Sequence, residues 1–303
     1  MMSNPSSRQL STNVSETQAT PKMSAFSRVF NRNGHGSPVE PETKPTGPPK
    51  SVWREYFESA VVTVIMALFG MTFVVQAVKV PTGSMQNTIT IGDHLLVNKF
   101  IFAPGNTLPF LPQREIVRGD IIVFKYPGNR YNPRRDESPN NRPIVTNYVK
   151  RVIGLPGDRI SIEGRNVIVN GTPLPEHRIE ADDNGDESPL NVKTDPPRKP
   201  GETYDVYYHS DSGDDQSSED YDAFTHEGNG KELVVPQNKY FVMGDNRENS
   251  EDSRYWGFVP REFVIGRAMF VYWSYDESAP NGNNPLSNFL FNTRWGRTGT
   301  MVK

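Results

Sequence analysis

The longest apolar run of the sequence is Ala60–Val78 (AVVTVIMALFGMTFVVQAV), which contains no charged residue. Its length of about 19 residues is roughly what a helix needs to cross a ~30 Å hydrocarbon core. Such a helix would be apolar on every face, which favours a transmembrane helix over a buried core helix. Because the run follows a long polar stretch, we interpret it as an uncleaved signal anchor at residues 59–79 rather than a cleavable signal peptide.

The residues before this anchor have no hydrophobic period and are rich in Ser, Asn, Pro and Thr. Residues 1–58 are therefore predicted to form a disordered tail. The basic residues of the tail are Arg8, Lys22, Arg28, Arg32, Lys44 and Lys50. Since basic flanks stay on the cytoplasmic side, the tail is predicted to be cytoplasmic and everything after Lys79 to lie outside the cytoplasmic membrane.

From residue 80 onward, short β-type runs alternate with turns. The predicted strands are His94–Phe102, Asp120–Tyr126, Tyr148–Leu155, Arg159–Glu163, Asn166–Val169, Glu232–Val235, Tyr240–Met243 and Val264–Tyr275. Asn170-Gly171 is a further turn signal. Helices and strands do not alternate, so a parallel α/β sheet does not fit, and a mainly β, antiparallel ectodomain is predicted over 80–278 with a C-terminal segment at 279–303.

Two polar segments are predicted to be surface insertions. Residues 128–142 are rich in Arg, Asn and Pro, and residues 180–230 are acidic and rich in Ser and Gly. The stretch Ser210–Asp222 lacks the spaced acidic residues of a calcium loop, which favours a solvated loop over a metal site. The apolar loop Phe100–Pro112 fits either contact with the bilayer or a packed satellite core.

The composition excludes some kinds of active site and binding partner. The chain has 303 residues, a formal net charge of −3 and no cysteine. The absence of cysteine excludes disulfides, thiolate metal sites and a cysteine nucleophile. The small net charge gives no global attraction to nucleic acid.

A candidate nucleophile, Ser84, lies in VPTGSM directly after the apolar run, and so at the outer membrane surface. A serine hydroxyl needs a base to remove its proton. The histidines are poorly placed for this role, because one is in the tail and three are in or beside the acidic segment: His35, His177, His209 and His226. The remaining His94 follows Asp93 in a strand, where adjacent side chains point to opposite faces. A Ser-His-Asp arrangement is therefore not favoured.

Lysine is the alternative base, provided that burial lowers its pKa from the ordinary value of ~10.4. Lys150 lies in the apolar run YVKRVIGLPGD, in which Tyr148 and Val152 share its face of the predicted strand. The spacing fits a buried base and an ordinary lysine on a half-exposed strand equally well.

Four segments occur in order behind the apolar run: VPTGSM, RGDIIVF (Arg118–Phe124), YVKRVIGLPGD (Tyr148–Asp158) and GDNRENSEDSRYWGFVP (Gly244–Pro260). Together they resemble the four sequence boxes of bacterial type I signal peptidases, the leader peptidases of peptidase family S26. The resemblance covers four short blocks within Val80–Pro260. It implies an ectodomain of antiparallel sheets and a serine endopeptidase that removes signal peptides from exported preproteins without a metal or cofactor.

By this resemblance, Ser84 is the nucleophile and Lys150 the general base. Ser250 matches the serine that orients the lysine, and Thr82 matches the position whose hydroxyl joins the Ser84 N–H in the oxyanion hole. The positions that match an apolar pocket for small substrate residues are Val80, Pro81, Met85, Ile89 and Val149. The positions that match structural charges, expected to hold Ser250 in place, are Asp245, Asp252 and Arg254.

One position departs from the family pattern. A proline usually follows soon after the Ser-Met pair, and here Asn87 stands in its place, without the fixed φ of proline. The expected partners are membrane-bound preproteins, added as a strand along a sheet edge, and the lipid bilayer, with no nucleic acid. Two alternatives remain: a non-enzymatic membrane-tethered β scaffold, and a LexA-type Ser/Lys autopeptidase, which would lack the apolar run and carry a DNA-binding head.

Overall fold

The structure is a computed structural model that describes residues 51–103, 113–183, 189–211, 213, 215–280 and 284–303. Residues 1–50 of the predicted tail lie outside the described residues. The chain divides into two units, Met1–Arg54 and Glu55–Lys303, and the three sheets described below lie within the second.

The first element is helix α1 (Val52–Phe69), which continues as a π-helical turn (Gly70–Val74). The helix therefore begins inside the segment predicted as tail, and none of its residues is buried. The prediction of a helix through residue 79 is wrong at its end, because strand β1 (Val75–Lys79) forms there and pairs with β2 (Asp93–Asn98). Among the described residues, no helix combines the length and apolar composition needed to span a membrane.

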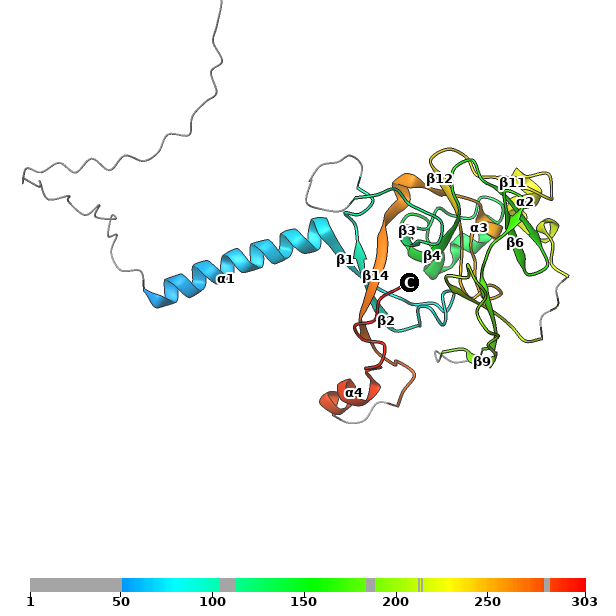
Figure 1. The fold of residues 1–303 in the computed structure, drawn as a ribbon. Coiled ribbons are helices and arrows are strands. Elements are labelled where there is room, and N and C mark those ends of the chain that lie inside the picture. Colours follow the sequence, from blue (N-terminus) through cyan, green and yellow to red (C-terminus); the bar gives the residue numbers. More distant parts are fainter. Residues whose placement is uncertain (1–50, 104–112, 184–188, 212, 214, 281–283) are drawn as a thin grey trace, which may run out of the picture. The chain divides into compact units, whose positions relative to one another are not determined.

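The main sheet has seven strands in the order β1-β2-β14-β3-β4-β12-β13, and every neighbouring pair is antiparallel. Its remaining strands are β3 (Ile121–Lys125), β4 (Asn147–Gly154), β12 (Lys239–Met243), β13 (Val259–Pro260) and β14 (Val264–Ser274). The orange strand β14 is the longest and lies beside β2 and β3 (Figure 1). Strand β4 lies inside the sheet and is paired on both edges, by β3 and β12, which matters for the site described below.

A second, antiparallel sheet has the order β11-β5-β6-β7. Its strands are β11 (Leu233–Val234), β5 (Arg159–Glu163), β6 (Asn166–Val169) and β7 (Thr172–Pro173). The predicted bounds of β5 and β6 are confirmed. The turn predicted at Asn170-Gly171 is also present, and both residues have the positive φ that such turns require, 53° and 78°.

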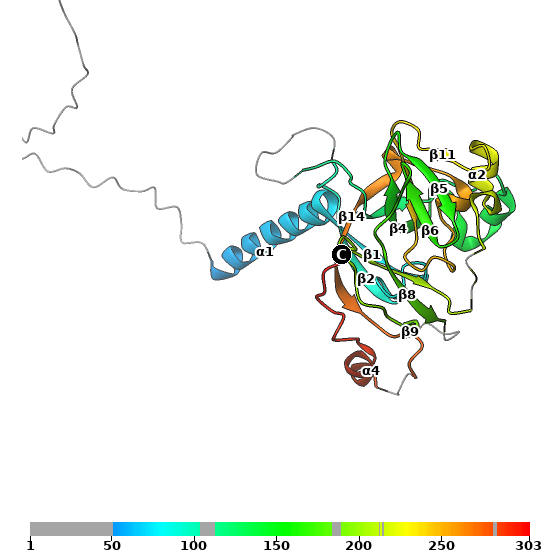
Figure 2. The same ribbon diagram turned by 45° about the vertical axis from the view of Figure 1, so that its right-hand side comes forward.

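The third sheet has the order β10-β8-β9, with β10 (Asp205–Tyr208) parallel to β8 (His177–Asp182) and β9 (Asn191–Thr194) antiparallel to it. In Figure 2, its strands β8 and β9 lie below β6 and above α4. This sheet falls largely inside 180–230, so part of the segment predicted as a surface insertion forms regular strands. Strand β8 alternates buried and half-exposed residues, which is the pattern of a strand with one face on a core.

The acidic stretch at 210–222 is also structured where it is described. A 3₁₀ turn (Ser218–Asp220) leads into helix α2 (Asp222–Glu227), which packs Phe224 into the same core as Phe241 and Phe258. Residues 184–188, 212 and 214 lie outside the described residues. The other helices are α3 (Ser253–Trp256) and α4 (Pro285–Asn292).

The segment 128–142 forms two 3₁₀ turns, Pro133–Glu137 and Pro139–Asn141. The Asp136 carboxylate ties it to the main sheet by accepting a hydrogen bond from the Tyr126 hydroxyl at 2.9 Å. In the loop after β2, Phe102 packs with Ile116 and with main-sheet residues such as Phe124 in one core cluster. Residues 104–112 of that loop lie outside the described residues.

Candidate active site

Three residues after strand β1, the chain forms a tight turn at residues 83–86, called the nucleophile turn below. Gln86 N donates a hydrogen bond to Gly83 O at 3.0 Å and closes the turn. A Cβ on Gly83 would lie 2.3 Å from the Gln86 side-chain oxygen, so only glycine fits without a shift. Ser84 lies in this turn and is 8% exposed.

Lys150 extends from strand β4 toward the nucleophile turn. Its Nζ lies 2.5 Å from Ser84 Oγ, although the two residues are 66 positions apart in the chain. Lys150 is 3% exposed, so the alternative of a surface lysine on a half-exposed strand is excluded. The structure brings the predicted pair together.

The surroundings of Lys150 favour its neutral form. Burial lowers the pKa of Lys150 from 10.5 to about 8, against the opposing attraction of Asp252. With a pKa of about 8, roughly one fifth of the amine is neutral at pH ~7.4, compared with about one part in a thousand for an ordinary lysine. A neutral amine within hydrogen-bond distance of a serine hydroxyl can act as its general base.

Ser250 lies beside this pair. Its hydroxyl donates to Asp252 Oδ2 at 2.8 Å, and the same carboxylate group accepts the Gly244 N–H at 3.0 Å and pairs with Arg254 Nε at 2.8 Å. Burial alone would raise the pKa of Asp252, but Arg254 and the hydrogen bonds hold it below its usual value. Asp252 and Arg254 thus fix Ser250, while the orientation of Lys150 by Ser250 stays a prediction.

The contacts of Asp245 differ from those expected of a residue that holds Ser250. It pairs with Arg151 at 2.7 Å and accepts a hydrogen bond from the Thr88 hydroxyl at 2.7 Å. It therefore ties strand β4 to the loop that follows the nucleophile turn. The expectation that Asp245 holds Ser250 is not met by these contacts.

A pocket of about 320 Å³ opens beside the Ser84–Lys150 pair. Four of the predicted pocket residues line it: Val80, Pro81, Met85 and Val149. Ile89 does not, because it is fully buried in the core cluster behind the turn, so its predicted place in the pocket is wrong. Thr82 lies exposed at the pocket rim.

The other side of the pocket comes from residues that the sequence did not single out. Among these residues are the polar Asn141, Asn147, Asn249 and Glu251. Asn141 belongs to the segment read as a surface insertion, and its side chain bonds both Tyr148 at 2.7 Å and Glu251 at 3.3 Å. The polar, low-complexity composition of 128–142 gave no signal that part of it faces the candidate site.

Asn246 is a further residue that sequence reasoning missed. Its backbone N–H donates to Ser84 O at 3.1 Å, and its side-chain Nδ2 donates to Gly83 O at 3.2 Å. It lies in the fourth sequence box, but only the folded geometry shows which carbonyls it binds. Asn87, at the position of the family proline, exchanges two hydrogen bonds with the Leu190 backbone, at 2.7 and 3.2 Å.

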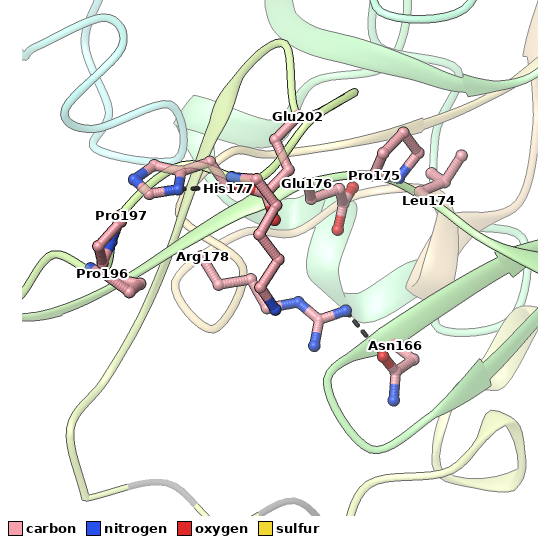
Figure 3. A pocket seen from close by; sticks show the side chains of 10 residues that line it. Asn166, Leu174, Pro175, Glu176, His177, Arg178, Pro196, Pro197 and Glu202 are labelled. Atoms are coloured by element: carbon pink, nitrogen blue, oxygen red, sulfur yellow. Dashed lines mark hydrogen bonds and ion pairs between the residues drawn. The ribbon is translucent and has the colours of Figure 1, made fainter.

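A second pocket, of about 270 Å³, lies at the third sheet (Figure 3). Figure 3 shows His177 bonded to Glu202 and Arg178 bonded to Asn166. The other ring nitrogen of His177 contacts Asp195 at 2.9 Å. Because carboxylates occupy both ring nitrogens, His177 is not placed to activate a serine, and the histidine alternative gains no support here.

Within the described parts of the chain, no group of acidic, histidine or cysteine side chains is arranged to hold a metal ion.

Several known proteins are similar to this chain. A family model described as "Signal peptidase, peptidase S26" matches residues 53–273. The probable signal peptidase I-2 of Synechocystis sp. is 31% identical over 77% of this chain and 79% of its own. The signal peptidase I of Leptolyngbya laminosa is 31% identical over 81% of this chain and 95% of its own. The signal peptidase I of Aquifex aeolicus is 32% identical over 74% of this chain and 86% of its own.

Proposed function

Since this chain belongs to the signal peptidases of peptidase family S26, we propose that Ser84 and Lys150 form its catalytic dyad. The chain is a serine endopeptidase that removes signal peptides from exported preproteins. One observation carries the assignment of the dyad: a lysine that is 3% exposed lies 2.5 Å from a serine hydroxyl at the end of a pocket.

In the proposed reaction, neutral Lys150 takes the proton from Ser84 as its oxygen attacks the carbonyl carbon before the scissile bond. The resulting tetrahedral oxyanion accepts hydrogen bonds from the Ser84 N–H and the Thr82 hydroxyl. Donors of this kind stabilise the transition state by roughly 3–4 kcal/mol each. Protonated Lys150 then donates to the leaving nitrogen, the peptide bond breaks, and a water molecule deprotonated by the same amine hydrolyses the ester.

The pocket supports a preference for small substrate residues. Val80, Pro81, Met85 and Val149 form its apolar side, close to Ser84. In the proposed complex, the stretch after the apolar core of a signal peptide lies along the pocket as an added strand, with small residues such as Ala at the first and third positions before the cut. Larger side chains are rejected by crowding.

We also propose that the enzyme acts at the outer face of the cytoplasmic membrane, with a single anchor that begins in α1 and a cytoplasmic N-terminus. The exposed apolar side chains of α1 support this placement, since they have no protein core to cover them. Protease treatment of right-side-out and inverted vesicles tests the topology. The ectodomain should be cut only in right-side-out vesicles, and cleavage in both or only in inverted vesicles would overturn the assignment.

The dyad is tested with the full chain in detergent and a purified preprotein. Ser84→Ala and Lys150→Ala should each reduce cleavage to background, while Lys125→Ala, a change of an exposed lysine on the neighbouring strand β3, should leave it unchanged. Cleavage by Lys150→Ala at the wild-type rate would remove the proposed mechanism. Cleavage by Ser84→Ala would also remove the nucleophile.

A further inference from the structure

Asn246 binds two consecutive carbonyls of the nucleophile turn, Gly83 O through its side chain and Ser84 O through its backbone. It is 1% exposed, so water does not compete for either hydrogen bond. A residue that touches the turn twice controls how the peptide groups of that turn are rotated.

The Gly83 carbonyl and the Ser84 N–H belong to one peptide group. In a planar trans peptide, the C=O and the N–H point in opposite directions. Gly83 O accepts hydrogen bonds from Asn246 Nδ2 and from Gln86 N, so it is turned toward these two donors. The Ser84 N–H must then point away from them. Within the described part of the chain, no acceptor pairs with this N–H, which leaves it free for a substrate oxygen.

We propose that Asn246 is a positioning residue for the oxyanion hole: it holds the Gly83–Ser84 peptide so that the Ser84 N–H faces the developing negative charge. The inference rests on the proposed function, because it takes Ser84 as the nucleophile. Asn246 does not itself line the pocket. It acts through the orientation of one peptide group.

Strand β10 of the third sheet hydrogen-bonds to the backbone on both sides of Asn246. Tyr207 N donates to Asp245 O at 2.8 Å, and Arg247 N donates to Tyr207 O at 3.0 Å, so strand β10 bridges the residues on both sides of Asn246. This gives the segment 205–208, which the sequence suggested was a solvated insertion, a function: it anchors the backbone from which Asn246 reaches the turn.

The neighbouring glycine shows how closely these parts approach. A Cβ on Gly244 would lie 2.4 Å from Ser84 O, so the end of β12 and the nucleophile turn are in direct contact. At such a distance, a small displacement of the loop that carries Asn246 is transmitted to Ser84.

The amide of Asn246 has to donate, and an isosteric change tests this requirement. Ionised aspartate has two acceptor oxygens and no donor. Asn246→Asp would therefore set a carboxylate oxygen against Gly83 O and push the peptide out of its orientation. Asn246→Ala removes the donor without adding a charge near Lys150.

The experiment uses the full chain in detergent and a peptide that spans a signal-peptide cleavage site. Removal of a direct oxyanion donor lowers kcat by about 10²–10³-fold, so loss of a residue that only orients the donor should lower it by about 10–100-fold. We expect KM to change less than about twofold, because ground-state binding is retained. The pH midpoint of kcat/KM for Asn246→Ala should equal that of the wild type, since the surroundings of Lys150 are unchanged.

Asn229→Asp serves as the matched control, because Asn229 is exposed and uses only its side-chain oxygen, as an acceptor from Lys231 N and Glu232 N. It should retain wild-type kcat. Wild-type kcat in a folded Asn246→Ala would overturn the inference, and so would a lower kcat with a shifted pH midpoint, which would mean that Asn246 acts through the lysine. Neither result bears on the assignment of Ser84 and Lys150 as the dyad. That assignment is contradicted only if Ser84→Ala or Lys150→Ala retains cleavage.

A second measurement needs no variant and remains informative if the Asn246 variants do not fold. A peptide boronic acid forms a tetrahedral adduct with a nucleophilic serine, and its oxygen mimics the oxyanion. In a crystal structure of the wild-type adduct, a boron-bound oxygen should lie about 2.7–3.1 Å from Ser84 N, with Gly83 O still bonded to Asn246 Nδ2. An adduct whose oxygens all lie beyond hydrogen-bond distance of Ser84 N would overturn the inference.

Discussion

Arg151 and Asp245 form a buried ion pair one position along β4 from Lys150, with 2.7 Å between Nη2 and Oδ2 and side chains 2% and 0% exposed. The pair joins the strand that carries the amine to the loop that follows the alcohol, since Asp245 also accepts the Thr88 hydroxyl. The relative placement of Ser84 and Lys150 therefore depends on an ion pair to which neither residue belongs.

Asp245→Asn is expected to be strongly destabilising, because it leaves the guanidinium of Arg151 buried without its counter-charge. Breaking a buried pair in this way costs about 3–5 kcal/mol of unfolding free energy. Urea denaturation measures it, with Glu277→Gln as the control. Glu277 pairs with Lys79 at the surface, with side chains 43% and 45% exposed, and such a pair contributes less than about 1 kcal/mol. Equal losses in the two variants would contradict the prediction.

Activity should depend on pH through Lys150. The base must be neutral, and its pKa is lowered to about 8, so kcat/KM should rise with pH, reach half its maximum near pH 8 and level off above it. Below pH 7, it should fall about tenfold per pH unit. The profile is measured between pH 6 and 10 on a peptide without titratable groups. A midpoint near 10 would mean that the amine is solvated in the working enzyme.

The same pKa shift carries a prediction for stability. The folded protein holds Lys150 at a pKa of about 8 and the unfolded chain at 10.5, so between these values the unfolded state binds more protons and stability rises with pH. Lys150→Met removes the buried amine. It should be more stable than the wild type by about 3 kcal/mol at pH 7, and the difference should shrink as pH approaches 10.5. Urea unfolding at pH 7 and 10 measures it, and a wild type that is the more stable at pH 7 would contradict it.

Gly244→Ala should inactivate the enzyme. The added Cβ would meet Ser84 O at 2.4 Å and Ser250 Oγ at 2.3 Å, and the backbone oxygen has no free rotation with which to yield. A displacement of the nucleophile by about 1 Å costs on the order of 10²-fold in rate. The comparison is Gly296→Ala, where a Cβ would meet nothing within 4 Å. Preprotein cleavage is measured for both, and an active Gly244→Ala would show that the turn is pliable.

Asn87→Ala should destabilise the protein, because Leu190 is 5% exposed and would lose both backbone partners that the Asn87 amide provides. Unmade hydrogen bonds of buried groups cost about 1–3 kcal/mol. Thermal unfolding measures the loss, with Asn191→Ala as control, since Asn191 is exposed at the start of β9. If both variants unfold at the same temperature, the Asn87–Leu190 contact contributes nothing.

The sequence predicted those parts of the fold whose pattern is local. The hairpin of β5 and β6 was predicted with its bounds, because alternation and turn residues suffice there. The third sheet was missed, because β8 carries charged residues on its outer face and β9 is exposed throughout, so the acidic composition hid a strand of period two. The predicted anchor helix ends too late, because the segment Val75–Lys79 can also form a strand when a partner strand is present, as β2 is here.

The sequence could identify the two proposed reacting residues of the candidate site, but not the residues that hold them in place. Ser84 and Lys150 could be named, since the sequence boxes carry them, and the structure brings them to 2.5 Å. The contacts of Asn246, the pairing of Asp245 with Arg151 and the burial of Ile89 depend on which backbone groups meet in space. A linear pattern does not hold that information.

The two reacting groups stand on parts of the molecule with different resistance to local opening. Strand β4 is hydrogen-bonded on both edges, by β3 and β12, so its amides should exchange with deuterium only when the whole domain unfolds. The nucleophile turn belongs to no strand and is held by a few hydrogen bonds, two of them from one asparagine. Mild heat or denaturant should therefore abolish proteolysis before the circular dichroism of the sheets changes, because the alcohol leaves the amine while the amine is still in place.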